Sequence, residues 1–119
     1  MKTTGPTNPQ LKALIIELQR LSRSQKVNLW KRVAEDLGKP TRKRREADLT
    51  RINRYTRDSE IALVPGKVLS TGELNKKIKV AAFKFSEKAM AKINKIGKAL
   101  TIDQLMKENP KGKNVRIIG

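Results

Sequence analysis

The chain has 119 residues, of which 28 are Lys or Arg and 11 are Asp or Glu, so its formal net charge at pH 7 is +17. It contains no cysteine and no histidine, which excludes disulfides and thiolate metal sites and removes the commonest general base and metal ligand. We therefore expect no enzyme, no metal, no cofactor and no small-molecule substrate, whereas the charge predicts a polyanionic partner.

The beginning of the chain predicts two helices. Asn8 is a good N-cap and Pro9 suits the first helical position. Helical spacing then places five apolar residues on one face: Leu11, Leu14, Ile15, Leu18 and Leu21. A second helix is predicted from about Leu29 to Leu37, with Gly38 closing its end. Its apolar face includes Trp30, for which we expect core packing rather than base stacking.

The segment from Gly38 to Glu46 reads GKPTRKRRE and has no apolar residue to bury. It predicts an exposed basic loop that becomes ordered only on RNA. Its cations are Lys39, Arg42, Lys43, Arg44 and Arg45. The following segment, Ala47 to Ile52, fits a strand or a helical turn equally well.

A second group of basic residues follows this loop. It consists of Arg51, Arg54 and Arg57, with Tyr55 among them. An arginine fork can bind two phosphate oxygens or stack on a base. Tyr55 is open to two interpretations, a nucleotide-stacking residue or an ordinary surface aromatic.

The second half of the chain alternates strand and helix patterns. Ile61–Val64 predicts a short strand stopped by Pro65-Gly66, and Gly66 and Gly72 predict turns. The apolar run Ile78–Phe85 is too continuous for a strand with one exposed face, so it predicts a strand covered on both faces. Phe83 and Phe85 are expected on the same face of this strand. Strands and helices in alternation predict an α/β fold with two N-terminal helices and a basic loop. The length and the absence of a linker predict one domain, residues 1–119.

Two more helices and a last strand are predicted near the end. Ser86 caps a helix that carries Ala89, Met90, Ile93 and Ile96 and ends at Gly97. Lys92 and Lys95 are expected on its outer side. Thr101 and Gln104 form a capping box for the last helix, which Asn109-Pro110 stops. Val115 to Ile118 predicts a closing strand.

A third group of cations surrounds Pro110 and Gly112. It includes Lys111, Lys113 and Arg116. The run Pro-Lys-Gly-Lys predicts a tight turn, which fits a close approach to phosphate and an ordinary surface turn equally well. Lys67, between Gly66 and Val68, is a similar case.

These features favour a structural RNA-binding protein, with a small DNA-compacting protein as the alternative. Both would bind with steep salt dependence, but they differ in ligand shape, folded RNA against duplex DNA. No stretch approaches the roughly 18 apolar residues of a membrane helix, so no membrane partner is expected.

Several segments together resemble one known family. They are TNPQL at 7–11, the stretch 37–52, INRYT at 52–56, VPGKVL at 64–69, VAAFKFS at 80–86 and ENPKGKNVRI at 108–117. In this order, over nearly the whole chain, they are similar to the archaeal and eukaryotic large-subunit ribosomal protein L-eighteen-e family. The chain departs from the family pattern at Thr41, Arg45, Ala47 and Asp48.

The resemblance implies a fold shared with the bacterial ribosomal protein L-fifteen, an irregular superhelix of β-β-α turns. It also implies a structural constituent of the large ribosomal subunit in the cytoplasm, of archaeal origin. The implied partners are folded large-subunit ribosomal RNA and neighbouring large-subunit proteins.

Overall fold

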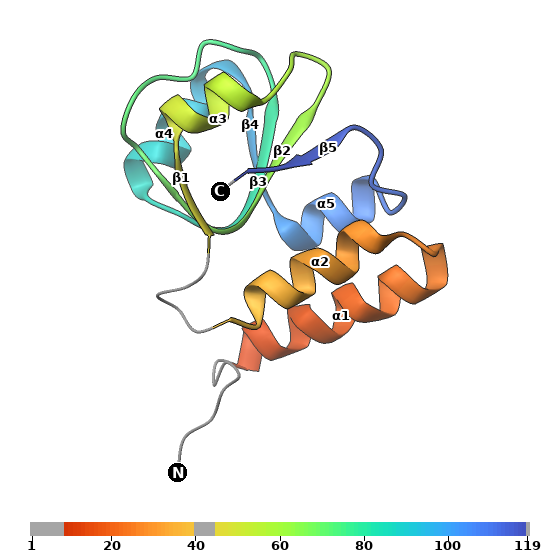
Figure 1. The fold of residues 1–119 in the computed structure, drawn as a ribbon. Coiled ribbons are helices and arrows are strands. Elements are labelled where there is room, and N and C mark those ends of the chain that lie inside the picture. The colour runs from red at the N-terminus through yellow and green to blue at the C-terminus, as the bar shows by residue number, and fades with distance from the viewer. Residues whose placement is uncertain (1–8, 40–44, 119) are drawn as a thin grey trace.

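The computed structural model describes residues 9–39 and 45–118. It contains helices, numbered from the N-terminus, and parallel strands (Figure 1). Their bounds are α1 Pro9–Gln25, α2 Asn28–Leu37, β1 Arg45–Asp48, α3 Leu49–Tyr55, β2 Ile61–Leu69, β3 Lys79–Phe85, α4 Glu87–Ile96, β4 Lys98–Thr101, α5 Ile102–Glu108 and β5 Val115–Ile117. The predicted α/β class is confirmed.

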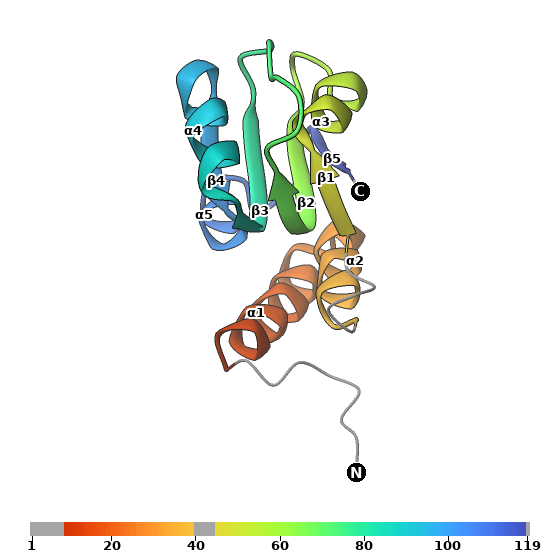
Figure 2. The ribbon, with the colours of Figure 1, turned by 90° about the vertical axis from the view of Figure 1, so that its left-hand side faces the viewer.

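The sheet has the order β1-β2-β3-β4, and every pair in it is parallel. The last strand, β5, also runs parallel to β2 and pairs with its first residues, while β1 pairs with its last residues. Helices cover both faces, as parallel sheets require. Figure 2 shows the α1–α2 pair below the strands, with α4 and α3 flanking their upper part.

Two apolar clusters lie on the two faces of the sheet. One joins the sheet to α3 and α4 through residues such as Ile52, Val80 and Ile93. The other joins it to α1, α2 and α5, and it contains Leu63 of β2 and the fully buried Trp30 of α2. Trp30 is therefore a core residue, as predicted.

The helix predictions are confirmed where the structure describes them. Ser86 accepts a hydrogen bond from Ala89 N at the start of α4, and Thr101 and Gln104 form the capping box of α5. Of the apolar residues that α4 carries, Met90 is 43% exposed, whereas Ala89 and Ile93 are fully buried. Asn8 lies outside the described residues.

The strand β2 corrects a second prediction. Pro65-Gly66 does not stop it, because Pro65 falls where no ladder hydrogen bond is needed from its nitrogen. On one edge, pairing with β5 ends at Leu63 and pairing with β1 begins at Gly66. On the other edge, the register with β3 shifts between Val64 and Lys67. The chain therefore crosses Pro65 and Gly66 as a bulge, and Gly66 is not a turn.

Phe83 and Phe85 do not share a face of β3, contrary to the prediction. Phe83 packs against the cluster of α1, α2 and α5, and Phe85 packs against the cluster of α3 and α4. The alternation of faces breaks opposite the register shift in β2. The short strand β4 was not predicted.

The predicted basic loop is shorter than its sequence indicated. Arg45 and Glu46 belong to β1, where they pair with Gly66 and Lys67. The ambiguous segment after them contains both predicted structures, since β1 runs to Asp48 and α3 begins at Leu49. Arg42, Lys43 and Arg44 lie outside the described residues. The ordering of the loop on RNA therefore stays a prediction.

Candidate nucleic-acid interface

The outer side of α3 presents a group of cationic and aromatic side chains. Arg51, Arg54 and Tyr55 are all exposed, and 51% of the Tyr55 surface is accessible to solvent. The guanidinium carbon of Arg51 lies 5.7 Å from the centroid of the Tyr55 ring, within cation–π range. The Asp48 side chain accepts a hydrogen bond from Arg51 N at 2.8 Å and so caps the helix. We call Arg51, Arg54 and Tyr55 the α3 face.

Helix α3 is held at both ends by the loop between β2 and β3. At its start, Leu49 N and Thr50 N both donate to Thr71 O, at 3.0 and 3.3 Å. At its end, Lys76 Nζ donates to Thr56 O at 2.6 Å. The α3 face is therefore carried by a backbone fixed to the body of the protein.

Lys92 in turn holds this loop, and this corrects its predicted place on the outer side of α4. Its Nζ donates to Ser70 O at 3.0 Å and to Gly72 O at 2.9 Å, and lies 3.0 Å from Glu73 Oε2. Lys95 is exposed as predicted. The sequence held no sign of the difference, because the partners of Lys92 lie about 20 residues away in the chain.

Arg57 and Arg116, far apart in the sequence, meet at Glu60. Arg116 donates to the two carboxylate oxygens of Glu60 at 2.8 and 2.9 Å, and Arg57 N donates to the same carboxylate at 2.9 Å. The hydrogen bonds from Arg116, followed by that from Arg57, lower the pKa of Glu60 to about 2. The same contact raises the pKa of Arg116. Part of the Arg116 fork is thus occupied by a carboxylate.

The predicted turn after α5 is confirmed. The Asn109 side chain accepts from Lys113 N at 3.1 Å and donates to Lys113 O at 2.8 Å. Gly112 has a φ of +65°, the left-handed region that favours glycine. Lys111 and Lys113 are exposed on this turn.

The described residues beside the basic loop differ in their surroundings. Lys39 follows α2 and forms an ion pair of 3.1 Å with Asp36, which is 4% exposed. Lys67 lies in β2 rather than in a turn, and it is exposed between its strand partners Glu46 and Lys84.

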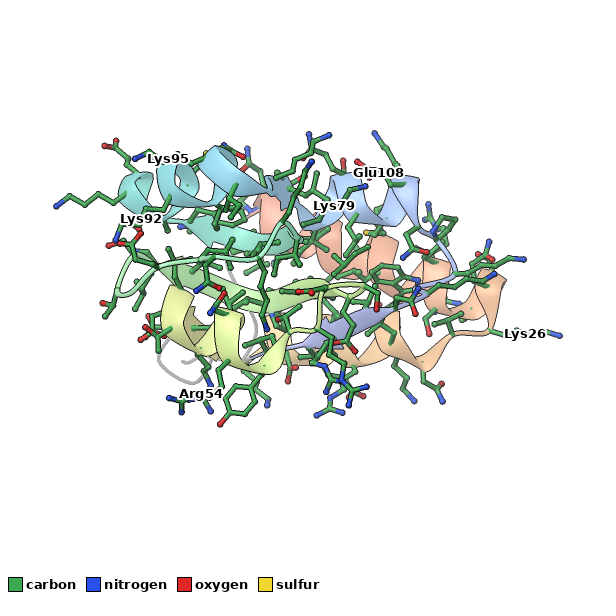
Figure 3. All side chains as sticks on the ribbon, turned by 90° about the horizontal axis from the view of Figure 1, so that it is seen from above. Lys26, Arg54, Lys79, Lys92, Lys95 and Glu108 are labelled. Carbon is green, nitrogen blue, oxygen red and sulfur yellow. The ribbon has the colours of Figure 1, made fainter. Side chains whose placement is uncertain are left out.

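The structure thus places the predicted cations in four regions, one of which is the turn after α5 with Lys111 and Lys113. Arg51 and Arg54 share the α3 face, the Arg116 side chain and the Arg57 backbone meet at Glu60, and Lys39 and Lys67 lie near the ends of the basic loop. Figure 3 shows the Arg54 side chain pointing outward on one side of the molecule and Lys95 on the other. The same view labels Lys79 and Glu108, whose side chains form an ion pair of 3.0 Å.

Residues 9–39 and 45–118 contain no cluster of acidic side chains suited to a metal ion. Within these ranges, no helix is long and apolar enough to cross a membrane.

The fold and these surfaces define a basic α/β protein whose exposed arginines and lysines suit a polyanion. The family model described as "Ribosomal protein 60S L18 and 50S L18e" matches residues 1–119. The chain belongs to this family of ribosomal proteins, which are structural components rather than enzymes.

Three relatives are each named "Large ribosomal subunit protein eL18". The protein of Methanoregula boonei is 43% identical over 118 residues, covering 98% of each chain. That of Methanococcus maripaludis is 44% identical over 119 residues, covering 99% of each. That of Haloarcula marismortui is 45% identical over 112 residues, covering 94% of this chain and 97% of the relative. The resemblance drawn from the sequence is confirmed.

Proposed function

We propose that the chain is a structural constituent of the large subunit of the cytoplasmic ribosome, where it binds and stabilises folded ribosomal RNA. Family membership and the names of the relatives support this role. The structural observation that carries it is the α3 face, where two arginines and a tyrosine are exposed together on a helix held at both ends. No observation on the described residues favours DNA compaction.

The chemistry of the α3 face suits irregular RNA. Each guanidinium can bind phosphate oxygens with a planar fork, and the Tyr55 ring, with Arg51 over it, offers a surface for an unstacked base. Because α3 is already fixed by the loop between β2 and β3, little order has to be gained when RNA binds. This lowers the entropic cost of each contact.

The remaining cations extend the proposed surface. On the described residues these are Lys39, Arg57, Lys67, Lys111, Lys113 and Arg116, and Arg42, Lys43, Arg44 and Arg45 join them from the basic loop and β1. Phosphate contacts from such residues position the protein without reading sequence. We further propose that neighbouring large-subunit proteins contact this chain in the assembled subunit.

Salt-dependent binding of the full chain to large-subunit ribosomal RNA tests the role of the α3 face. In Arg51→Ala/Arg54→Ala, the slope of log affinity against log salt should fall by up to about two units, since each lost phosphate contact removes ~0.7–0.9. The matched control Lys88→Ala/Lys95→Ala removes the same charge from α4, where both side chains are exposed. If the salt slope falls equally in the control, the α3 face makes no specific RNA contact and contributes only to the overall positive charge.

A second comparison addresses the basic loop. Arg42→Ala/Lys43→Ala/Arg44→Ala should lower the slope by up to about three units, against a control with three exposed lysines changed. That control is Lys12→Ala/Lys88→Ala/Lys95→Ala. Duplex DNA serves as competitor in both series. If it displaces the chain from folded RNA at equal concentration, the proposed RNA role fails.

A further inference from the structure

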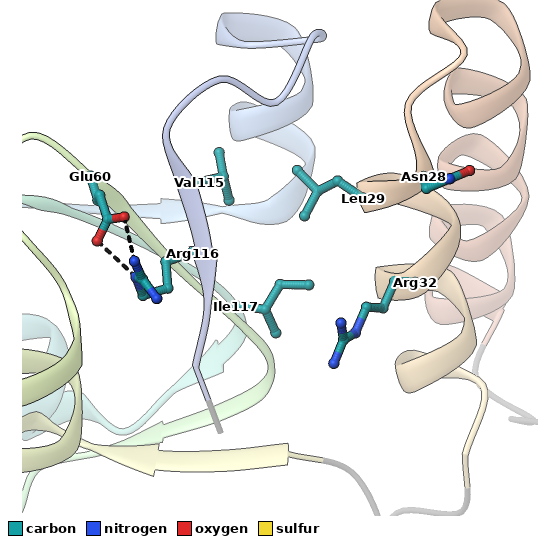
Figure 4. A pocket seen from close by; sticks show the side chains of 7 residues that line it. All are labelled: Asn28, Leu29, Arg32, Glu60, Val115, Arg116 and Ile117. Atoms are coloured by element: carbon teal, nitrogen blue, oxygen red, sulfur yellow. Dashed lines mark hydrogen bonds and ion pairs between the residues drawn. The ribbon is translucent and has the colours of Figure 1, made fainter.

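Two hollows along α2 meet at Asn28 and Arg32. The first, of about 500 Å³, lies between the first turns of α2 and β5, and its walls include Leu29 and Ile117. The second, of about 510 Å³, continues from Arg32 along the outer side of α2 to Lys39. We call the two together the α2 groove. Figure 4 shows Leu29 and Ile117 pointing toward one another across its first half, with Arg32 beside them.

The groove runs between two basic segments that are distant in the sequence. At one end is Lys39, at the start of the basic loop. At the other end the turn after α5 packs on the start of α2. Trp30 Nε1 donates to Pro110 O at 2.7 Å, and a Cβ on Gly112 would lie 2.6 Å from Leu29 Cδ2. The exposed lysines of this turn are thereby held beside the groove.

The charges in the groove leave one guanidinium available. Asp36 is paired with Lys39 at 3.1 Å, and Glu60 is paired with Arg116 at 2.8 Å. Within the described part of the chain, Arg32 is exposed and forms no hydrogen bond or ion pair. An anion at Arg32 would therefore meet a guanidinium with no other partner. The carboxylates at the two ends of the groove, Asp36 and Glu60, are already neutralised by their own cations.

One carboxylate in the groove, Glu35, forms no ion pair with any described residue, and the start of α2 adds positive charge at the other end. Glu35 is exposed on the wall of the second hollow. At the start of α2, the N-cap residue Val27 supplies no side-chain cap, so the first amides of the helix add partial positive charge to the first hollow. An anion is thus favoured in the half of the groove between Arg32 and β5.

We propose that an RNA strand follows the α2 groove and that Arg32 binds one of its backbone phosphates, with the ribose or base against Leu29 and Ile117. This inference rests on the proposed ribosomal RNA-binding function and adds a site to it. The volume of the first hollow suits a group of nucleotide size. RNA is favoured over an acidic peptide because both ends of the groove adjoin segments proposed to bind RNA, so one strand can contact them in succession.

The first test measures the affinity of the full chain for large-subunit ribosomal RNA. Arg32→Gln should weaken it roughly tenfold or more, since a charge-assisted bidentate contact is lost, and should lower the salt slope by about one unit. Arg32→Lys should keep the slope but recover only part of the affinity, because an ammonium lacks the fork. Arg20→Gln, which changes an exposed arginine of α1 that lines neither hollow, is the matched control and should change affinity less than about twofold.

The second test identifies the occupant. The chain has no cysteine, so Asn28→Cys creates a unique attachment point for a benzophenone photocrosslinker at the groove. Crosslinks are analysed in large subunits assembled with the labelled chain, and Lys95→Cys on α4 is the control position. Crosslinks to ribosomal RNA from position 28 support the proposal. Crosslinks to a protein alone, or none from position 28, overturn it.

The two proposals fail in different ways. If the unchanged chain does not bind folded RNA, the proposed function fails and the groove with it. If the unchanged chain binds RNA and Arg32→Gln binds equally well, the groove proposal alone is overturned. Unchanged unfolding midpoints for the Arg32 variants ensure that a loss of affinity is not a loss of fold.

Discussion

Replacing Trp30 by alanine tests how much the contact between α2, the sheet and the turn after α5 contributes to stability. The side chain is fully buried, and its Nε1 donates to Pro110 O at 2.7 Å. Removing a buried aromatic side chain costs roughly 3–5 kcal/mol, to which the lost hydrogen bond contributes about 1. Against a total stability of roughly 5–15 kcal/mol for a domain, Trp30→Ala should remove about a fifth of it at the least and nearly all of it at the most.

Two further variants separate the causes of this loss. Trp30→Phe keeps an aromatic ring but loses the hydrogen bond and some volume, so it should cost about 1–2 kcal/mol. Tyr55→Ala removes an aromatic side chain that is 51% exposed, and it should change stability by less than about 0.5 kcal/mol.

The assay is urea unfolding without RNA, followed by far-UV circular dichroism, because Trp30 is the only tryptophan and its fluorescence is lost in the variants. In the unchanged chain, fluorescence and circular dichroism should report one coincident transition, since we propose that residues 1–119 form a single domain. A loss of less than about 1.5 kcal/mol in Trp30→Ala would refute the reasoning. Equal losses in Trp30→Ala and Trp30→Phe would assign the effect to the hydrogen bond instead of the packing.

Three other predictions follow from contacts that fix the loops. Gly72→Ala should cost more than about 1 kcal/mol in urea unfolding, because Gly72 has a φ of +88° and its Cβ would lie 1.9 Å from Thr50 Oγ1. Lys92→Met should cost about 1 kcal/mol and speed amide exchange at the start of α3, since it frees the loop that binds there. Glu60 has a folded-state pKa of about 2, depressed by Arg116, so its contribution to stability is present above pH 4.5 and should be lost as pH falls from 4.5 toward 2. Glu60→Gln should lack that part of the acid titration.

Matched variants control the first two of these predictions. Gly38 has a φ of −75°, and a Cβ there meets only ordinary contacts, so Gly38→Ala should leave stability nearly unchanged. Lys95→Met removes an exposed lysine from the same helix as Lys92 and should leave the exchange of α3 amides as it is. Faster exchange in Lys95→Met would contradict the role given to Lys92.

The sequence alone determined the features that depend on near neighbours in the chain. The apolar spacing of α1 and α2, the Ser86 cap and the capping box at Thr101 all act over three or four residues. The basic character of the surface, the buried Trp30 and the family resemblance also came from the sequence. These are properties of composition and local pattern, which folding leaves unchanged.

The tertiary structure decided what depends on partners far along the chain. Pro65 continues a strand because β5 pairs with the residues of β2 before it and β1 pairs with those after it. The local sequence around Pro65 contains neither of those strands. Cations that look alike in the sequence receive different roles, since Lys92 holds a loop, Arg116 binds Glu60, and Arg32 remains available in a groove. Whether a charge is paired or free depends on which distant backbone carbonyl or carboxylate the fold brings within about 3 Å of it, and only the folded chain sets that distance.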